Sequence, residues 1–174
     1  SIKYNNEIIN SHLIGDFQFD NILLAICIGK YFNVSNENIK KSIENYIPTN
    51  NRSQLVKTKK NTLILDAYNA NPSSMKAMLN SFANQEYKNK LCIIGDMLEL
   101  GGESNNEHLE IIKLTNQLEL DCIFVGEIFY SLTKNSFKNK QELVKYIQVN
   151  NIHKRTILLK GSRGIGLEQL IKNL

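Results

Sequence analysis

The sequence contains few cysteines and no long apolar stretch. Its 174 residues include three cysteines, Cys27, Cys92 and Cys122, which lie far apart and form no CxxC pair, so we expect neither a disulfide framework nor a zinc site. Each cysteine lies in an apolar run, and we predict that all three are reduced core residues of a cytosolic protein. No apolar run approaches the roughly 18 residues of a membrane span, and residues 1–5 do not resemble a signal peptide.

The chain also lacks the common phosphate-binding signatures and a basic stripe. Neither G-x-x-x-x-G-K-[ST] nor G-x-G-x-x-G occurs, so the sequence gives no support to a P-loop or to hydride transfer on NAD. Lys and Arg number 21 against 17 Asp and Glu, a net charge of +4, and they are scattered along the chain. We therefore expect no nucleic-acid partner.

Residues 1–50 differ in pattern from the rest. Residues 7–14 predict a strand, residues 19–28 begin a helix that is apolar nearly all round, and a second helix over about 36–46 ends at Pro48. Two helices and one strand make a poor core. We therefore expect this segment to pack against something outside the chain, and we place a domain boundary near residue 50.

Residues 51–174 alternate between short apolar runs and amphipathic helices. The runs at 63–65, 91–94, 122–125 and 157–159 are typical of strands buried on both faces, and Ser53–Lys57 predicts an additional antiparallel strand. Asn71-Pro72 opens one helix as N-cap and first residue, and Ser104 to Glu107 predicts a capping box for another. This alternation predicts an α/β domain with a mostly parallel sheet.

Polar residues follow the apolar runs, where the carboxyl ends of parallel strands form ligand sites. Two roles are open for Asp66: its carboxylate accepts a hydrogen bond from a ribose hydroxyl, or it stabilises the turn that follows. Asn71 either contacts a ligand or caps a helix. Asp96 and Glu99 are candidates for contact with a metal ion or a basic residue, but we favour the alternative that they lie in a solvated loop. We expect His108 to pack or cap rather than catalyse.

The segment Lys160-Gly161-Ser162-Arg163 places two cations at a predicted strand-to-helix junction. Backbone N–H groups at the start of a helix attract anions, so this segment is a candidate anion site. The alternative is that Arg163 pairs with a surface carboxylate such as Glu168.

Three strings at these strand ends resemble motifs of the Mur ligase family, in its members that add D-alanyl-D-alanine (MurF type). They are Asp66 to Met75 (DAYNANPSSM), Gly95 to Gly101 (GDMLELG) followed by Ser104 and His108, and Lys160 to Gly164 (KGSRG). The resemblance implies that 51–174 is the whole C-terminal domain, Rossmann-like with helices on both faces of the sheet. It implies that 1–50 is the tail of the central ATPase domain.

The resemblance also implies site residues. Nucleotide contacts are expected from Asn21, Arg52, Asp66 and Tyr68, and substrate contacts from Asn69, Asn71, Lys160, Ser162 and Arg163. Phe17 and Gln18 depart from the family, which commonly has His and Asn there. No catalytic or metal-binding residue is assigned, because the family's phosphate loop, Mg²⁺ ligands and modified lysine lie in the central domain, and the UDP-sugar domain precedes that.

The implied activity is that of a cytoplasmic, ATP- and Mg²⁺-dependent ligase of cell-wall peptidoglycan synthesis. Such an enzyme phosphorylates the carboxylate of UDP-MurNAc-tripeptide, and the amine of D-Ala-D-Ala then attacks the acyl phosphate. This chain would close over the nucleotide and position the acceptor, and would be inactive without the domains that precede it. The alternatives are another Mur or folylpolyglutamate-type ligase domain, or a free-standing nucleotide-binding Rossmann-like module.

Overall fold

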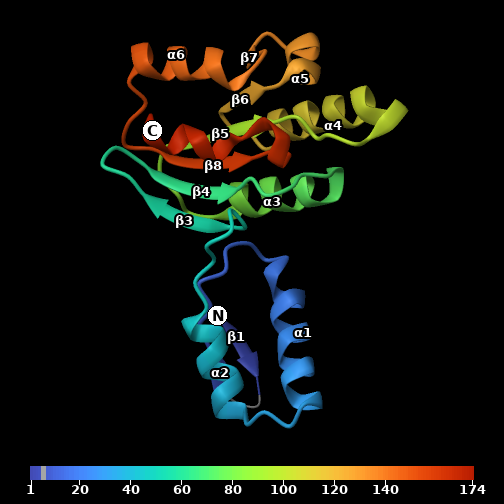
Figure 1. Ribbon diagram of the computed structural model, residues 1–174, viewed down its shortest axis with the longest axis vertical. Coiled ribbons are helices and arrows are strands. Elements are labelled where there is room, and N and C mark those ends of the chain that lie inside the picture. The colour runs from blue at the N-terminus through green and yellow to red at the C-terminus, as the bar shows by residue number, and fades with distance from the viewer. Residues whose placement is uncertain (5–6) are drawn as a thin grey trace.

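The N-terminal part of the chain is a small unit of two strands and two helices. The computed structural model describes residues 1–4 and 7–174 (Figure 1). β1 (Ile2–Tyr4) pairs antiparallel with β2 (Glu7–Ile9), and both lie beside α1 (Gln18–Tyr31) and α2 (Asn36–Asn45). A small core joins these elements, made of Ile9, Ile22, Ile26, Ile39 and Ile43.

Both predicted helices of this part are confirmed, and the strand predicted over 7–14 is too long. β2 ends at Ile9, and residues 10–14 have no regular structure. The backbone N–H of Asn10 donates to the Glu44 carboxylate of α2 at 3.1 Å, so a side chain takes the hydrogen bond that a continuing strand would have used.

The rest of the chain forms a six-stranded sheet. Its strands are β3 (Gln54–Lys57), β4 (Thr62–Asp66), β5 (Lys90–Gly95), β6 (Cys122–Val125), β7 (Ser136–Phe137) and β8 (Thr156–Lys160), in the order β3-β4-β8-β5-β6-β7. All neighbours are parallel except β3 and β4. Because β8 lies between β4 and β5, the carboxyl ends of these three strands meet at one edge of the sheet.

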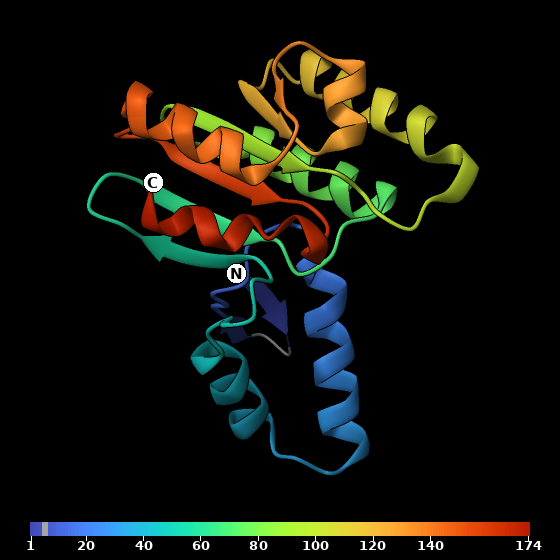
Figure 2. The same cartoon turned by 45° about the horizontal axis from the view of Figure 1, so that its top comes forward.

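Helices cover both faces of this sheet, as Figure 2 shows. On one face α3 (Pro72–Asn84), α4 (Ser104–Gln117) and α5 (Glu127–Leu132) bury a cluster that includes Met75, Phe82, Ile111 and Phe129. On the other face α6 (Lys140–Asn150) and the 3₁₀ segment η3 (Leu167–Lys172) bury Leu143, Ile147, Leu167 and Leu170. The α/β fold with a mostly parallel sheet and helices on both faces is therefore confirmed.

The two helix starts predicted from the sequence have different outcomes. Asn71 caps α3, its side chain accepting from the Ser74 N–H at 2.8 Å, with Pro72 at the first helical position. The capping box at Ser104 is wrong. The 3₁₀ turn η1 (Gly101–Glu103) leads directly into α4, so Ser104 is already helical and its side chain caps nothing.

Two further expectations are corrected. Cys92 and Cys122 are buried, but Cys27 is exposed, because it lies on the side of α1 that faces away from the small N-terminal core. No α-helix follows β8. The chain continues through the 3₁₀ segments η2 (Arg163–Ile165) and η3, so the predicted helix N-terminus at Lys160 to Arg163 does not form. The short elements α5 and β7 were not predicted.

A candidate site at the carboxyl edge of the sheet

Asp66 and Lys160 form a buried ion pair at the carboxyl ends of β4 and β8. They are register partners at the last position of these neighbouring strands, and Lys160 Nζ lies 2.5 Å from Asp66 Oδ2. The Lys160 side chain is only 2% exposed and that of Asp66 is 15% exposed. Lys160 therefore faces a protein carboxylate and is not open to solvent.

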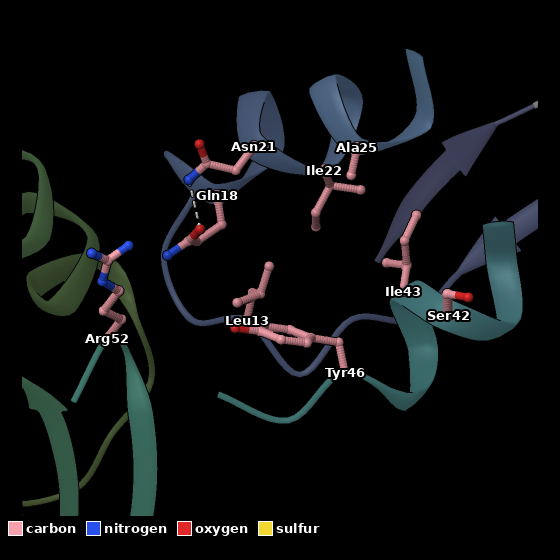
Figure 3. A pocket seen from close by; sticks show the side chains of 9 residues that line it. All are labelled: Leu13, Gln18, Asn21, Ile22, Ala25, Ser42, Ile43, Tyr46 and Arg52. Carbon is pink, nitrogen blue, oxygen red and sulfur yellow. Dashed lines mark hydrogen bonds between the residues drawn. The ribbon is translucent and has the colours of Figure 1, made fainter. Parts of the chain in front are cut away.

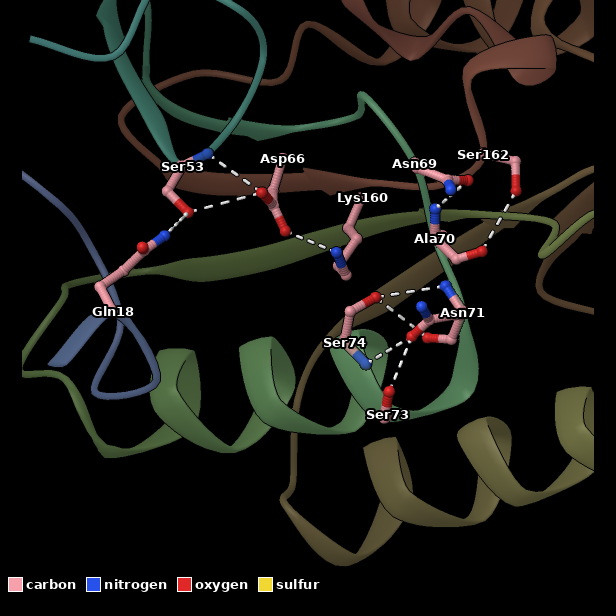
Figure 4. A network of polar contacts seen from close by, with 10 residues as sticks. All are labelled: Gln18, Ser53, Asp66, Asn69, Ala70, Asn71, Ser73, Ser74, Lys160 and Ser162. Atoms are coloured by element: carbon pink, nitrogen blue, oxygen red, sulfur yellow. Dashed lines mark hydrogen bonds and ion pairs between the residues drawn. The ribbon is translucent and has the colours of Figure 1, made fainter. Parts of the chain in front are cut away.

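A chain of hydrogen bonds continues from Asp66 to the N-terminal part (Figure 4). Asp66 Oδ1 accepts from the Ser53 backbone N–H at 3.0 Å and from the Ser53 hydroxyl at 3.4 Å. Ser53 Oγ in turn accepts from the Gln18 side-chain amide of α1 at 3.2 Å. Neither Ser53 nor Gln18 was predicted as a site residue. The only local signals were that Ser53 follows Arg52 and that Gln18 lies three residues before Asn21.

The connection between the two parts has an unusual backbone. Asn51 and Ser53 both have positive φ, 54° and 50°, which few residues other than glycine adopt. Arg52 between them is exposed, and its guanidinium lies over the Tyr68 ring, 4.0 Å from the centroid. The guanidinium of Arg163 lies 5.7 Å from the same ring. Tyr68 thus brings together one arginine from the connection and one from the loop after β8.

A cavity of about 510 Å³ lies beside Arg52 (Figure 3). Its polar lining includes Arg52, Asn21 and Gln18, and its apolar lining comes from Leu13, Ile22 and Ala25, among others. The Asn21 amide donates to Gln18 Oε1 at 2.8 Å. An apolar cavity with a few polar groups and one cation at its rim is suited to a planar organic ligand with an anionic substituent.

Most of the other predicted site residues form hydrogen bonds within or between the loops that carry them. Asn69 Oδ1 accepts from the Ala70 N–H at 2.8 Å, and Asn71 is occupied as the α3 cap. The buried Ser162 hydroxyl accepts from the Leu98 N–H at 2.9 Å and contacts the Ala70 carbonyl at 3.5 Å. Ser162 therefore joins the loops that follow β4, β5 and β8. Arg163 remains exposed at their rim and forms no ion pair with Glu168.

Asp96 is structural, and the solvated loop expected for it is wrong. Its carboxylate is buried and accepts from the backbone N–H groups of Ile128 and Phe129, both at 3.0 Å, at the start of α5. His108 is fully buried, as expected for a packing residue. Its Nε2 accepts from the Met97 N–H, which assigns the proton to Nδ1, 2.6 Å from the Ser104 carbonyl. Among the residues that the structure describes, no cluster of three or more His, Cys, Asp or Glu could hold a metal ion.

The structure therefore brings together Arg52, Asp66, Tyr68, Lys160 and Arg163 at one edge, with Asn21 across the adjoining cavity. A family model described as "Mur ligase, glutamate ligase domain" matches residues 51–163. The chain belongs to the Mur ligase family. The match begins at the connection with positive φ, covers the first two sequence motifs whole and includes the third as far as Arg163.

Individual Mur ligases are similar over nearly the whole chain. The UDP-N-acetylmuramoyl-tripeptide–D-alanyl-D-alanine ligase of Bacillus subtilis is 31% identical over 93% of this chain and 38% of its own length. The crystal structure of MurF from Acinetobacter baumannii has a TM-score of 0.83 and 26% identity, over 97% of this chain and 40% of that one. MurF of Thermotoga maritima in complex with ADP has a TM-score of 0.76 at 18% identity, over 92% of this chain and 38% of that one.

The chain thus spans about two fifths of the length of these relatives. Within the part that the structure describes, no helix is both long and apolar enough to cross a membrane.

Proposed function

We propose that residues 1–174 form the C-terminal part of a Mur ligase that adds D-alanyl-D-alanine to a UDP-MurNAc-tripeptide in the cytoplasm, with ATP as co-substrate. The observation that carries the proposal is that two exposed arginines, Arg52 and Arg163, both lie near the ring of Tyr68, in the loop that follows Asp66. A ligase that uses ATP to form an acyl phosphate and then joins the acyl group to a dipeptide has two anionic ligands to hold, the nucleotide and the carboxylate of the dipeptide. Two separate cations at one edge match that requirement.

The nucleotide side consists of Asn21, Arg52, Asp66 and Tyr68. Arg52 reaches the phosphates, Asp66 accepts a hydrogen bond from the ribose, and Asn21 contacts the base from the cavity wall. Two observations support this: the cavity of about 510 Å³ has both Asn21 and Arg52 in its lining, and the similar Thermotoga protein was solved with ADP. In this proposal the Mg²⁺ ligands belong mostly to the central domain, as the resemblance to the family implies.

The acceptor side consists of Arg163, with Asn69, Asn71 and Ser162 shaping the loops around it. D-Ala-D-Ala carries a terminal carboxylate, and a guanidinium holds a carboxylate through two parallel hydrogen bonds. Arg163 is exposed and forms no ion pair with any residue that the structure describes, which leaves it available for this role. Holding the dipeptide while its amine attacks the acyl phosphate is catalysis by positioning.

Residues 1–50 are the tail of the central ATPase domain in this proposal, and 51–174 are the C-terminal domain. Support comes from the exposed apolar side chains of the N-terminal part, which include Leu24 (60% exposed), Ile28 (51%), Tyr31 (81%) and Phe32 (71%). An exposed apolar surface of this kind indicates a contact with another domain. The rest of the central domain would cover it.

The test is the full-length polypeptide incubated with ATP, UDP-MurNAc-tripeptide and one candidate acceptor at a time. We expect phosphate release with D-Ala-D-Ala that exceeds release with D-Glu, L-Lys or L-Glu at least about a hundredfold. Preference for one of the other acceptors would assign the chain to another ligase of the superfamily, and nucleotide binding without ligation would favour a binding module.

We expect residues 1–174 alone to give no phosphate release above a blank in the same assay, because the resemblance to the family places the groups that hold the β- and γ-phosphates in the central domain. Substrate-dependent phosphate release by this chain alone would contradict the assignment of phosphate binding to the central domain.

A further inference from the structure

Lys160 contacts the nucleotide side of the candidate site rather than the acceptor side. Its ammonium is 2.5 Å from Asp66 Oδ2 and its side chain is 2% exposed, so an incoming carboxylate cannot reach it without opening the strand ends. Lysine is rarely buried to this extent without a partner. The partner here is the residue that we assign to the ribose.

The acceptor positions of Asp66 are nearly all in use. An ionised carboxylate has about four lone-pair positions, two on each oxygen. Oδ1 accepts from the Ser53 N–H and the Ser53 hydroxyl, and Oδ2 accepts from Lys160. One position therefore remains, and it lies on the oxygen that Lys160 holds.

The two partners of Asp66 come from different parts of the fold. Ser53 belongs to the positive-φ connection and contacts Gln18 of α1, whereas Lys160 belongs to β8 in the middle of the sheet. Of these, Lys160 is the rigid support, because both ends of its contact are the last residues of hydrogen-bonded parallel strands.

We propose that Lys160 is a positioning residue for nucleotide recognition: it holds Oδ2 of Asp66 so that the free lone pair of this oxygen accepts a hydrogen bond from one ribose hydroxyl. The inference rests on the proposed function, in which Asp66 contacts the nucleotide. It removes Lys160 from the acceptor-binding set and leaves Arg163 as the cation for the dipeptide.

The experiment measures ribose selectivity in the full-length ligase. kcat and KM are determined with ATP, 2′-deoxy-ATP and 3′-deoxy-ATP for the wild type, Lys160→Met, Asp66→Asn and the double variant. The control is Lys57→Met, which removes an exposed lysine of β3. We expect the wild type to prefer ATP over one deoxy analogue by about tenfold or more, the scale of one charge-assisted hydrogen bond.

Lys160→Met reduces this preference to within about twofold by raising the KM for ATP, while the KM for the disfavoured analogue barely changes. In the Asp66→Asn background, Lys160→Met changes the preference for ATP by less than about twofold, because both substitutions remove the same interaction. Lys57→Met keeps the wild-type preference. A purely structural lysine would lower kcat with all three nucleotides alike and leave the preference intact, and that result would overturn the inference.

Different results would contradict the proposed function itself. If the wild type does not discriminate, or if Asp66→Asn keeps the full preference, then Asp66 does not contact the ribose. If Asp66→Asn abolishes the preference and Lys160→Met keeps it, only the role of Lys160 is wrong. Should Lys160→Met not fold, Lys160→Gln is measured for the same ratio, because its side chain is neutral and one bond shorter and so leaves Asp66 Oδ2 without the ammonium. A preference reduced below about threefold supports the inference, and the wild-type preference contradicts it.

Discussion

The guanidinium carbon of Arg52 lies 4.0 Å from the centroid of the Tyr68 ring, which holds the connection between the two parts of the chain against the loop after β4. Arg52 is exposed and has no carboxylate partner within the described residues, so the ring is its principal contact. A cation over an exposed aromatic ring contributes about 0.5–1 kcal/mol. Tyr68 therefore preorganises the arginine that we assign to the nucleotide phosphates.

The first prediction concerns this stacking. In the full-length ligase, Tyr68→Leu raises the KM for ATP by about two- to fivefold, the factor equivalent to the stacking energy. Tyr68→Phe keeps the ring and serves as the matched control, with a change below about twofold. Steady-state kinetics at saturating acceptor measures both. Equal effects of the two substitutions would mean that the hydroxyl, and not the ring, matters.

The second prediction concerns Asp96. Its buried carboxylate accepts from the Ile128 and Phe129 N–H groups in the first turn of α5 and is their only side-chain partner among the described residues, so Asp96→Ala lowers the free energy of unfolding by about 2–3 kcal/mol. Gly126→Ala is also destabilising, because a Cβ there would lie 2.2 Å from Asp96 Cγ and φ is +131°. Urea denaturation of residues 1–174 gives these values.

The control for Asp96 is Glu99→Ala, in the same loop. Glu99 is exposed and we expect its removal to change stability by less than about 0.5 kcal/mol. If Asp96→Ala behaved like Glu99→Ala, the carboxylate would not stabilise α5.

The third prediction concerns thiol reactivity. Hydrogen bonding to Cys122, together with burial, raises the pKa of the Cys92 thiol well above its usual value. At pH 8 the folded chain therefore exposes one fast-reacting thiol to Ellman's reagent, that of Cys27, and all three react in denaturant. Cys27→Ser removes the fast thiol. Rapid reaction of a second thiol in the folded chain would contradict the buried Cys92–Cys122 pair.

The same raised pKa has a consequence for stability. Above the ordinary cysteine pKa of about 8.5, the unfolded chain loses the Cys92 proton while the folded chain retains it. The contribution of this thiol to stability is therefore complete below about pH 8.5 and declines as the pH rises further. Thermal unfolding at a series of pH values between 7 and 10 measures this, and we expect stability to decline less with pH in Cys92→Ala than in the wild type.

Sequence patterns predicted the elements that depend on apolar periodicity. The four apolar runs became β4, β5, β6 and β8 because strands covered on both faces require continuous apolar sequence. Asn71-Pro72 opened α3 because both residues act on the backbone that directly follows them. Ser104 did not cap α4, because the preceding 3₁₀ turn, which leaves no clear mark in the sequence, starts the helix earlier.

The candidate site was harder to predict because its contacts are long-range. Asp66 and Lys160 are 94 positions apart in the chain and meet only because β8 inserts beside β4. A lysine after an apolar run is indistinguishable, in sequence, from a solvated one. Likewise, Cys27 lies in an apolar helix that buries only one side in this chain, so its exposure could not be read from its neighbours.

The fourth prediction concerns the boundary near residue 50. Amides of residues 20–32 exchange with solvent faster than those of 62–65, because α1 buries only Ile22 and Ile26 whereas β4 lies inside the sheet. Hydrogen exchange with mass spectrometry on residues 1–174 measures this. Equal protection of the two segments would show that they form one cooperative unit and that the boundary is misplaced.

The most direct test of the account compares two arginines in the full-length ligase. Arg52→Ala is expected to raise the KM for ATP by about tenfold or more and to leave the KM for D-Ala-D-Ala within about twofold, and Arg163→Ala is expected to do the reverse. The KM for UDP-MurNAc-tripeptide should barely change in either variant. If Arg163→Ala instead weakens ATP and leaves the dipeptide unaffected, the loop after β8 belongs to the nucleotide and the division of this edge into two sides is wrong.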